Sequence, residues 1–138
     1  MKKILIAAAS LLFMSTLAKA EDVIITVDVS EQAMLVETPM DSFIWPVSTA
    51  RKGYHTPIGV YQPYRMAKMH YSKKYDNSPM PHSIFFKGGY AIHATYDIKR
   101  LGRPASHGCV RLAPRDAQWL YRIVREYGME NTTVVVQE

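Results

Sequence analysis

One cysteine and two histidines are the residues of this sequence that are best suited to chemistry. Cys109 is the only cysteine; it follows Ser106, His107 and Gly108, and His93 lies upstream of it. A thiol and an imidazole can form a nucleophile and its general base, because histidine can accept the thiol proton near neutral pH. Gly108 permits a positive φ, which would let the amides of Gly108 and Cys109 face a developing oxyanion. These residues predict acyl transfer.

The same residues also have structural explanations. A lone cysteine is often a small buried hydrophobic residue. His93 follows Tyr-Ala-Ile at residues 90–92, so a hydrogen-bonded histidine at a strand end would explain it. His93, His107 and Cys109 are also residue types that bind zinc, but no second cysteine and no H-E-x-x-H spacing accompany them. A nucleophile, a buried thiol and a zinc site are therefore the three alternatives.

The sequence around Cys109 resembles a known catalytic signature. SHGCVRL at residues 106–112, preceded by GGYAIHA at 88–94, is similar to the signature of the YkuD-type L,D-transpeptidases. Further stretches similar to the family lie upstream, namely WPVST at 45–49, TPIG at 56–59 and MPHSIFF at 80–86. Arg111 stands where many members have asparagine, and the spacer from His93 to Ser106 is shorter than usual. The resemblance covers residues 23–137.

This resemblance implies a cell-wall enzyme without a cofactor or a metal. Cys109, deprotonated by His93, would attack the third residue of a peptidoglycan tetrapeptide stem and release D-alanine. An amine of a second stem would then accept the acyl group and give a 3-3 cross-link. An amine of an outer-membrane protein as acceptor would attach that protein to the wall, and water would make the enzyme an L,D-carboxypeptidase. A non-catalytic peptidoglycan-binding module is the competing class of protein.

Several neighbouring residues are candidates for supporting roles. His107 could orient the turn, line the oxyanion pocket or act as the main base. Ser106 and Arg111 are candidate substrate-binding residues; Arg111 would pair with a substrate carboxylate, or else point outward from a strand without a partner. By the resemblance, residues 66–81 would flank the groove, with His70 and Tyr75 as further candidates. Considered alone, His70 and Tyr75 would be surface residues.

The first 20 residues read as a secretory signal. Lys2 and Lys3 precede an apolar run at residues 4–17, and Ala-Lys-Ala at 18–20 forms a small-x-small cleavage site. The run is too short to span a bilayer comfortably, so cleavage is favoured over an uncleaved anchor. We therefore expect an exported protein in the periplasm or cell envelope, with residues 21–138 forming one catalytic domain and no transmembrane anchor after cleavage.

Charge is concentrated in one part of the sequence. Loss of residues 1–20 would lower the net charge from +5 to +2, but residues 51–111 contain eleven lysines and arginines against two acidic residues. Such a segment attracts acidic ligands, which suits the carboxylates of peptidoglycan stems. Nucleic acid is not an expected partner of an exported protein. A free thiol in an oxidising compartment is better explained by reactivity than by architecture.

The hydrophobic pattern predicts a mainly β, sandwich-like fold of mixed sheets with one helix in the C-terminal half. The helix is expected at 114–127, because Pro114 and Asp116 suit its first turn, apolar residues recur at helical spacing and Gly128 follows. Trp119 and Tyr121 are assigned to its packing face. Residues 66–81 are read as a long surface loop. The expected strands are 23–29, 33–37, 42–48, 60–61, 83–86, 90–93 and 131–137.

Overall fold

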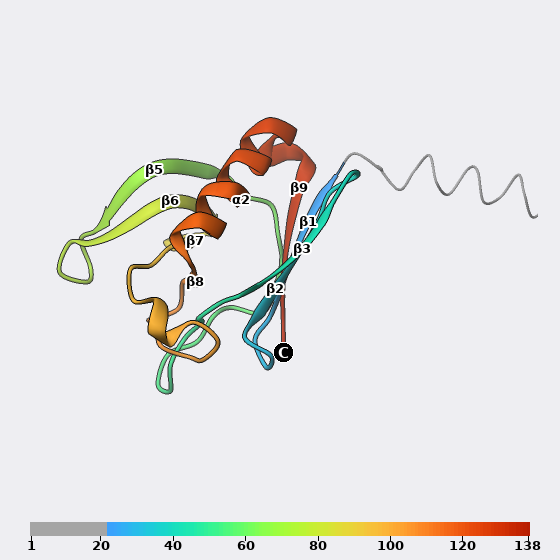
Figure 1. Ribbon diagram of the computed structural model, residues 1–138. Coiled ribbons are helices and arrows are strands. Elements are labelled where there is room, and N and C mark those ends of the chain that lie inside the picture. The colour runs from blue at the N-terminus through green and yellow to red at the C-terminus, as the bar shows by residue number, and fades with distance from the viewer. Residues whose placement is uncertain (1–21) are drawn as a thin grey trace, which may run out of the picture.

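Two β-sheets enclose the main core in the computed structural model, which describes residues 22–138 (Figure 1). One sheet has the strand order β3-β2-β1-β9-β4, from β1 Val23–Asp28, β2 Ala33–Glu37, β3 Ser42–Pro46, β4 Gly59–Tyr61 and β9 Thr132–Gln137. The other has the order β5-β6-β7-β8, from β5 Arg65–Ser72, β6 Ser78–Lys87, β7 Tyr90–Ala94 and β8 Val110–Leu112. The predicted signal at residues 1–20 lies outside the described residues.

The five-stranded sheet is built on its two central strands. Strand β1 alternates buried and more exposed residues, and Val23, Ile25 and Val27 are fully buried. Strand β9 pairs with it in parallel, and its β-branched residues Val134 and Val136 are buried beside them. Strand β3 lies at the edge of the sheet, where Pro46 is tolerated because its nitrogen has no neighbouring strand to which it would have to donate. The predicted opening hairpin, edge strand and buried last strand are confirmed.

Helix α2, Pro114–Tyr127, packs against β6 and β7 of the four-stranded sheet (Figure 1). Its buried face consists of Ala117, Leu120, Tyr121 and Val124, and Gly128 ends it with a φ of 99°. The assignment of Trp119 to this face was wrong. Trp119 is 45% exposed, because at about 100° per residue it projects from the side of the helix roughly opposite the centre of the buried face. The predicted bounds of the helix and the mainly β class are confirmed.

Two short 3-10 helices, η1 Ile98–Arg100 and η2 Met129–Asn131, complete the described elements. None of the helices in residues 22–138 has the length and hydropathy that a membrane crossing requires.

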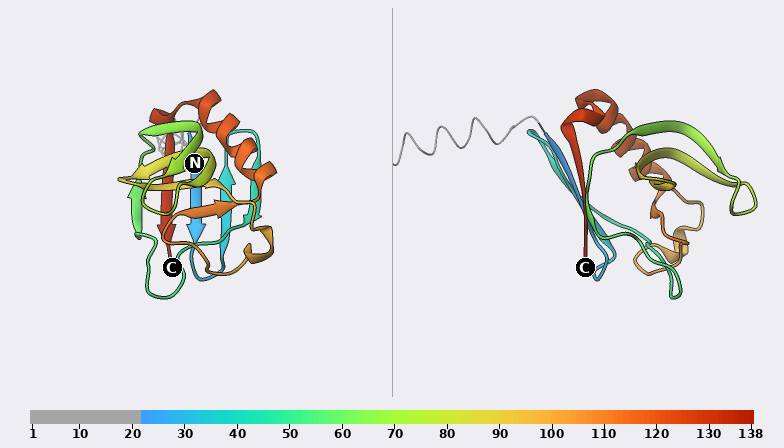
Figure 2. Two further views of the ribbon diagram at one scale, coloured as in Figure 1. Left: turned by 90° about the vertical axis from the view of Figure 1, so that its left-hand side faces the viewer. Right: turned by 180° about the vertical axis from the view of Figure 1, so that it is seen from behind.

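The segment predicted as a long loop at 66–81 is instead a hairpin of β5 and β6, which projects away from the five-stranded sheet (Figure 1, Figure 2). Asp76 and Asn77 have φ values of 53° and 57° in its turn, a conformation that these residue types tolerate. Pro79 and Pro81 suggested a loop because proline cannot donate to a ladder. Strand β7 pairs with β6 only from Ile84 onward, so the part of β6 that contains Pro79 and Pro81 has no partner strand on the β7 side. A proline nitrogen that faces this side has no hydrogen bond to lose, and both prolines fit the strand.

Replacing the fully buried Leu120 by alanine should destabilise the protein by about 2–5 kcal/mol, because the cavity removes contacts between α2 and the sheet. Denaturant unfolding followed by circular dichroism would measure the change. Val60→Ala is the control, since Val60 is 71% exposed and should change the free energy of unfolding by less than about 0.5 kcal/mol. Equal effects of the two changes would contradict this packing.

Candidate active site

Parallel pairing of β7 and β8 places Cys109 and His93 on one face of the four-stranded sheet. His93 is paired with Arg111, and alternate residues of a strand share a face. Cys109, two residues before Arg111, therefore lies on the face of His93, about one strand spacing of 4.8 Å across and two residues along. The intervening residues point the other way and are buried in the main core, namely Ile92, Ala94, Val110 and Leu112.

A groove with a volume of about 640 Å³ covers this face. The β5–β6 hairpin forms one wall, and residues 95–107 form much of the other. The candidate residues that line the groove are Cys109, His93, His107, Ser106, Arg111, Tyr75 and His70. Gly108 is the one candidate that does not line it. The fold thus gathers residues that are distant in the sequence around one cavity.

His93 is held as a neutral imidazole. Its side chain is only 7% exposed, and Nδ1 donates a hydrogen bond to the carbonyl oxygen of Ala94 at 2.7 Å. This bond makes Nε2 the unprotonated nitrogen. Burial lowers the pKa of His93 to about 4; the bond to Ala94 raises the pKa, and the charge of Arg111 lowers it. At neutral pH the ring can therefore accept a proton but does not already carry one.

Cys109 rests as a neutral thiol. Its side chain is partly exposed in the groove and packs against the small apolar cluster of Met80, Phe85 and Ala91. Burial raises the pKa of the thiol above its ordinary value of 9.0, while the amide of Ala91 and the charge of Arg111 act in the opposite direction. The explanation of Cys109 as a buried hydrophobe is thus only partly right, because the residue packs on apolar neighbours yet reaches the groove.

The turn before Cys109 is fixed by a hydroxyl and by a glycine. Ser106 Oγ donates to the carbonyl of Cys109 at 2.6 Å and accepts the amide of Gly108 at 3.0 Å. Gly108 has a φ of 141°, and a Cβ there would lie 2.5 Å from Tyr90 Cε1. Because the amide of Gly108 is engaged by Ser106, it is not free to bind an oxyanion as predicted. The amide of Cys109 is the remaining candidate donor.

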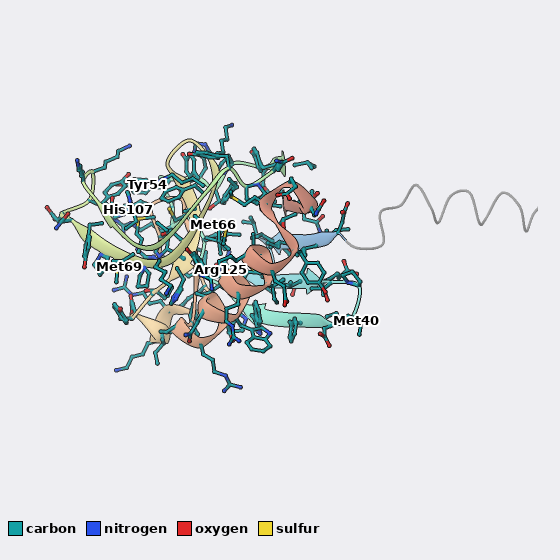
Figure 3. The ribbon with its side chains drawn as sticks, turned by 90° about the horizontal axis from the view of Figure 1, so that it is seen from above. Met40, Tyr54, Met66, Met69, His107 and Arg125 are labelled. Atoms are coloured by element: carbon teal, nitrogen blue, oxygen red, sulfur yellow. The ribbon has the colours of Figure 1, made fainter. Side chains whose placement is uncertain are left out.

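His107 is clamped between aromatic rings beside the groove. Its ring stacks on Tyr75 at 4.0 Å with an interplanar angle of 7°, and Tyr54 contacts it edge-on at 4.8 Å. Figure 3 shows Tyr54 and His107 side by side. Nε2 of His107 lies 2.7 Å from Nη2 of Arg51, so it accepts a hydrogen bond from the guanidinium. Burial, followed by the charge of Arg51, lowers the pKa of His107. These contacts suit an orienting role for His107 better than a base role.

Arg51 and Tyr54 had not been singled out from the sequence. Both are more than 50 positions from His107, and no local pattern links such distant residues. The stretch TPIG at 56–59 was the nearest signal, because it marked this segment as family-like.

The groove is electropositive. Arg51, Lys73, Lys74, Arg100 and Arg111 line it, whereas Asp97 is its one acidic residue among those described and pairs with Arg100 at 3.2 Å. His70 forms part of the hairpin wall, edge-on to Phe85 at 5.1 Å. Such a lining attracts ligands that carry carboxylates. In residues 22–138, no group of three or more His, Cys, Asp or Glu side chains is arranged to hold a metal ion, so the zinc alternative lacks a ligand set.

The rate of Cys109 alkylation by iodoacetamide should rise about tenfold per pH unit through neutral pH and level off only above pH 9, because the thiolate is the reactive species and burial raises the thiol pKa. Mass spectrometry of timed samples would measure this rate, with glutathione as the reference thiol. A plateau that is already reached by pH 7 would indicate a preformed thiolate–imidazolium pair and would contradict the neutral resting state.

Comparisons with known proteins place the chain in a family and show which folds it resembles. A family model for the L,D-transpeptidase catalytic domain matches residues 22–136. Two similar solved structures are an L,D-transpeptidase from Stackebrandtia nassauensis, with 28% identity and a TM-score of 0.74, and one from Mycobacterium smegmatis, with 19% and 0.75. The match covers 85% of this chain in both cases, and 56% and 59% of those chains.

A third similar structure is L,D-transpeptidase 3 from Mycobacterium tuberculosis in complex with a faropenem-derived adduct, with 21% identity and a TM-score of 0.71. The match covers 85% of this chain and 60% of that one. This chain thus spans less than two thirds of the solved structures that it resembles. No curated protein matched it.

Proposed function

This chain belongs to the family of L,D-transpeptidase catalytic domains, and we propose that it is an exported cysteine acyltransferase that acts on peptidoglycan stem peptides. Cys109 is the nucleophile and His93 the general base. The observation that carries this proposal is the β7–β8 register, which holds thiol and imidazole on one sheet face within one groove.

Acylation begins with a proton transfer between neutral groups. The thiol proton of Cys109 moves to Nε2 of His93 as the sulfur attacks the carbonyl carbon of the third stem residue. The amide of Cys109 binds the developing oxyanion, and one such donor is typically worth about 3 kcal/mol of barrier. Collapse of the intermediate breaks the peptide bond to the terminal D-alanine. The resulting imidazolium is a strong acid, because burial lowers the pKa of His93, and it protonates the leaving amine.

The second step returns the free thiol. A side-chain amine of another stem attacks the thioester, and His93 takes the amine proton. The new amide bond forms as the carbon–sulfur bond breaks, and His93 passes the proton to the departing sulfur. Between two third residues this bond is a 3-3 cross-link, and with an amine of an outer-membrane protein it attaches that protein to the wall. Water as the acceptor gives an L,D-carboxypeptidase. The electropositive groove supports acceptors that carry carboxylates, as stem peptides do.

Incubation of the protein with purified muropeptides should release D-alanine and yield tetrapeptide–tripeptide cross-links, identified by mass spectrometry. Faropenem should add a covalent mass to the protein, as the adduct of the M. tuberculosis structure suggests. Cys109→Ala should abolish both results, because no other thiol is present. Tripeptide products without cross-links would identify a carboxypeptidase. Failure of the folded wild-type protein to form either an adduct or a product would favour the wall-binding module.

His93→Ala should lower the rate of faropenem acylation by about 10²–10⁴-fold, because the thiol loses its proton acceptor. His107→Ala is the matched control, since it removes the same ring from a residue that is held by Tyr75 and Arg51. We expect a much smaller loss there, with an unchanged pH profile. Stopped-flow or timed mass spectrometry between pH 4 and pH 9 would measure both. A larger loss in His107→Ala would assign the base role to His107 instead.

A further inference from the structure

Thr56 joins two distant parts of the chain directly behind the nucleophile. Its Oγ1 donates a hydrogen bond to the carbonyl oxygen of Gly108 at 2.8 Å and accepts one from the amide of Ala50 at 3.1 Å. The side chain is 6% exposed and does not line the groove. Both hydrogen-bonding functions of this buried hydroxyl are therefore used to hold backbone.

The bond to Gly108 fixes the direction of the next amide. A peptide bond is planar and trans, so its carbonyl and N–H groups point in opposite directions. With the carbonyl of Gly108 bound to Thr56 behind the turn, the N–H of Cys109 points to the opposite side. The hydrogen bonds of the described turn engage the amide of Gly108, but not that of Cys109.

The remaining constraints on this peptide act in the same sense. Ser106 holds the carbonyl of Cys109, and Tyr90 and the carbonyl of His55 leave no room for a side chain at Gly108. Within the Gly108–Cys109 peptide itself, the carbonyl is the group that a described hydrogen bond holds, and Thr56 provides that bond. Thr56 therefore restrains rotation of this peptide, while Ser106 holds the peptides on either side.

We infer that Thr56 is a positioning residue, which aims the amide of Cys109 at the oxyanion formed during acyl transfer. This inference rests on the proposed function, because an oxyanion forms only if Cys109 attacks a carbonyl. Thr56 itself touches neither substrate nor sulfur. Its contribution is to pre-orient the amide dipole before the reaction, which is the condition under which such a donor lowers the barrier.

Thr56→Val removes the hydroxyl and keeps the shape of the side chain. We expect the rate of faropenem acylation to fall about 10–100-fold, mainly through the maximal rate rather than through half-saturation. This is less than the loss of about 10²–10³-fold seen when an oxyanion donor is removed, because the amide is retained and loses only its orientation. Alkylation by iodoacetamide should stay within about twofold of wild type, because displacement at a saturated carbon forms no oxyanion. Thr56→Ser retains the hydroxyl and should restore most of the acylation rate.

Thr132→Val is a matched control. Thr132 is also a buried threonine outside the groove whose Oγ1 donates to a glycine carbonyl at 2.8 Å, but this glycine is Gly128 at the end of α2 and not the neighbour of Cys109. It should lower the melting temperature about as much as Thr56→Val and leave acylation unchanged.

The outcomes separate the possible failures. Equal losses of acylation and alkylation in Thr56→Val would show that the hydroxyl only maintains the fold, and so would a loss of acylation in Thr132→Val. Unchanged acylation in a folded Thr56→Val protein would also overturn the inference. If wild type is alkylated but never acylated, the proposed function itself has failed, and the result is recognised before any variant is compared.

Discussion

The structure depends on the register between the parallel strands β7 and β8. A shift of one residue would turn every side chain of β8 to the opposite face. Cys109 and Arg111 would then enter the aliphatic core, and Val110 and Leu112 would face the groove. The fully buried Val110 and Leu112 oppose such a shift, because exposing both would forfeit several kcal/mol of apolar burial. The core thus fixes where the chemical groups lie.

Burial of His93 and Cys109 on this face of the four-stranded sheet explains why both side chains are neutral. Burial disfavours the charged form of any group, so it lowers the pKa of His93 and raises that of Cys109. A preformed ion pair would have to overcome both effects. The groove therefore holds a weak base, the imidazole of His93, beside a weak acid, the thiol of Cys109. The thiolate and the imidazolium form only while a substrate is reacting. Arg111, across from His93, acts on both groups because its positive charge favours the thiolate and disfavours the imidazolium.

Much of this could be predicted from the sequence where the pattern is local. Helix 114–127 carried its own start and stop signals, and the residue types around Cys109 and His93 marked them as a candidate nucleophile and base. Their common face was not predicted, because it follows from the parallel pairing of β7 and β8. The β5–β6 hairpin was missed because its prolines and lysines look like a loop until the pairing partners are known. Arg51, Tyr54 and Thr56 act across more than 50 residues, so only the folded chain reveals their contacts. The groove-lining positions of His70 and Tyr75 could be expected only through the family resemblance.

The stack of Tyr75 on His107 joins the tip of the hairpin to the opposite wall. Contact between these rings ties the hairpin tip to the residue that precedes Gly108 and Cys109. The tip cannot swing away from the turn without separating the rings, which would forfeit the attraction of a stacked aromatic pair. The hairpin is therefore anchored at both ends, by its strand pairing with the sheet and by this stack at its tip.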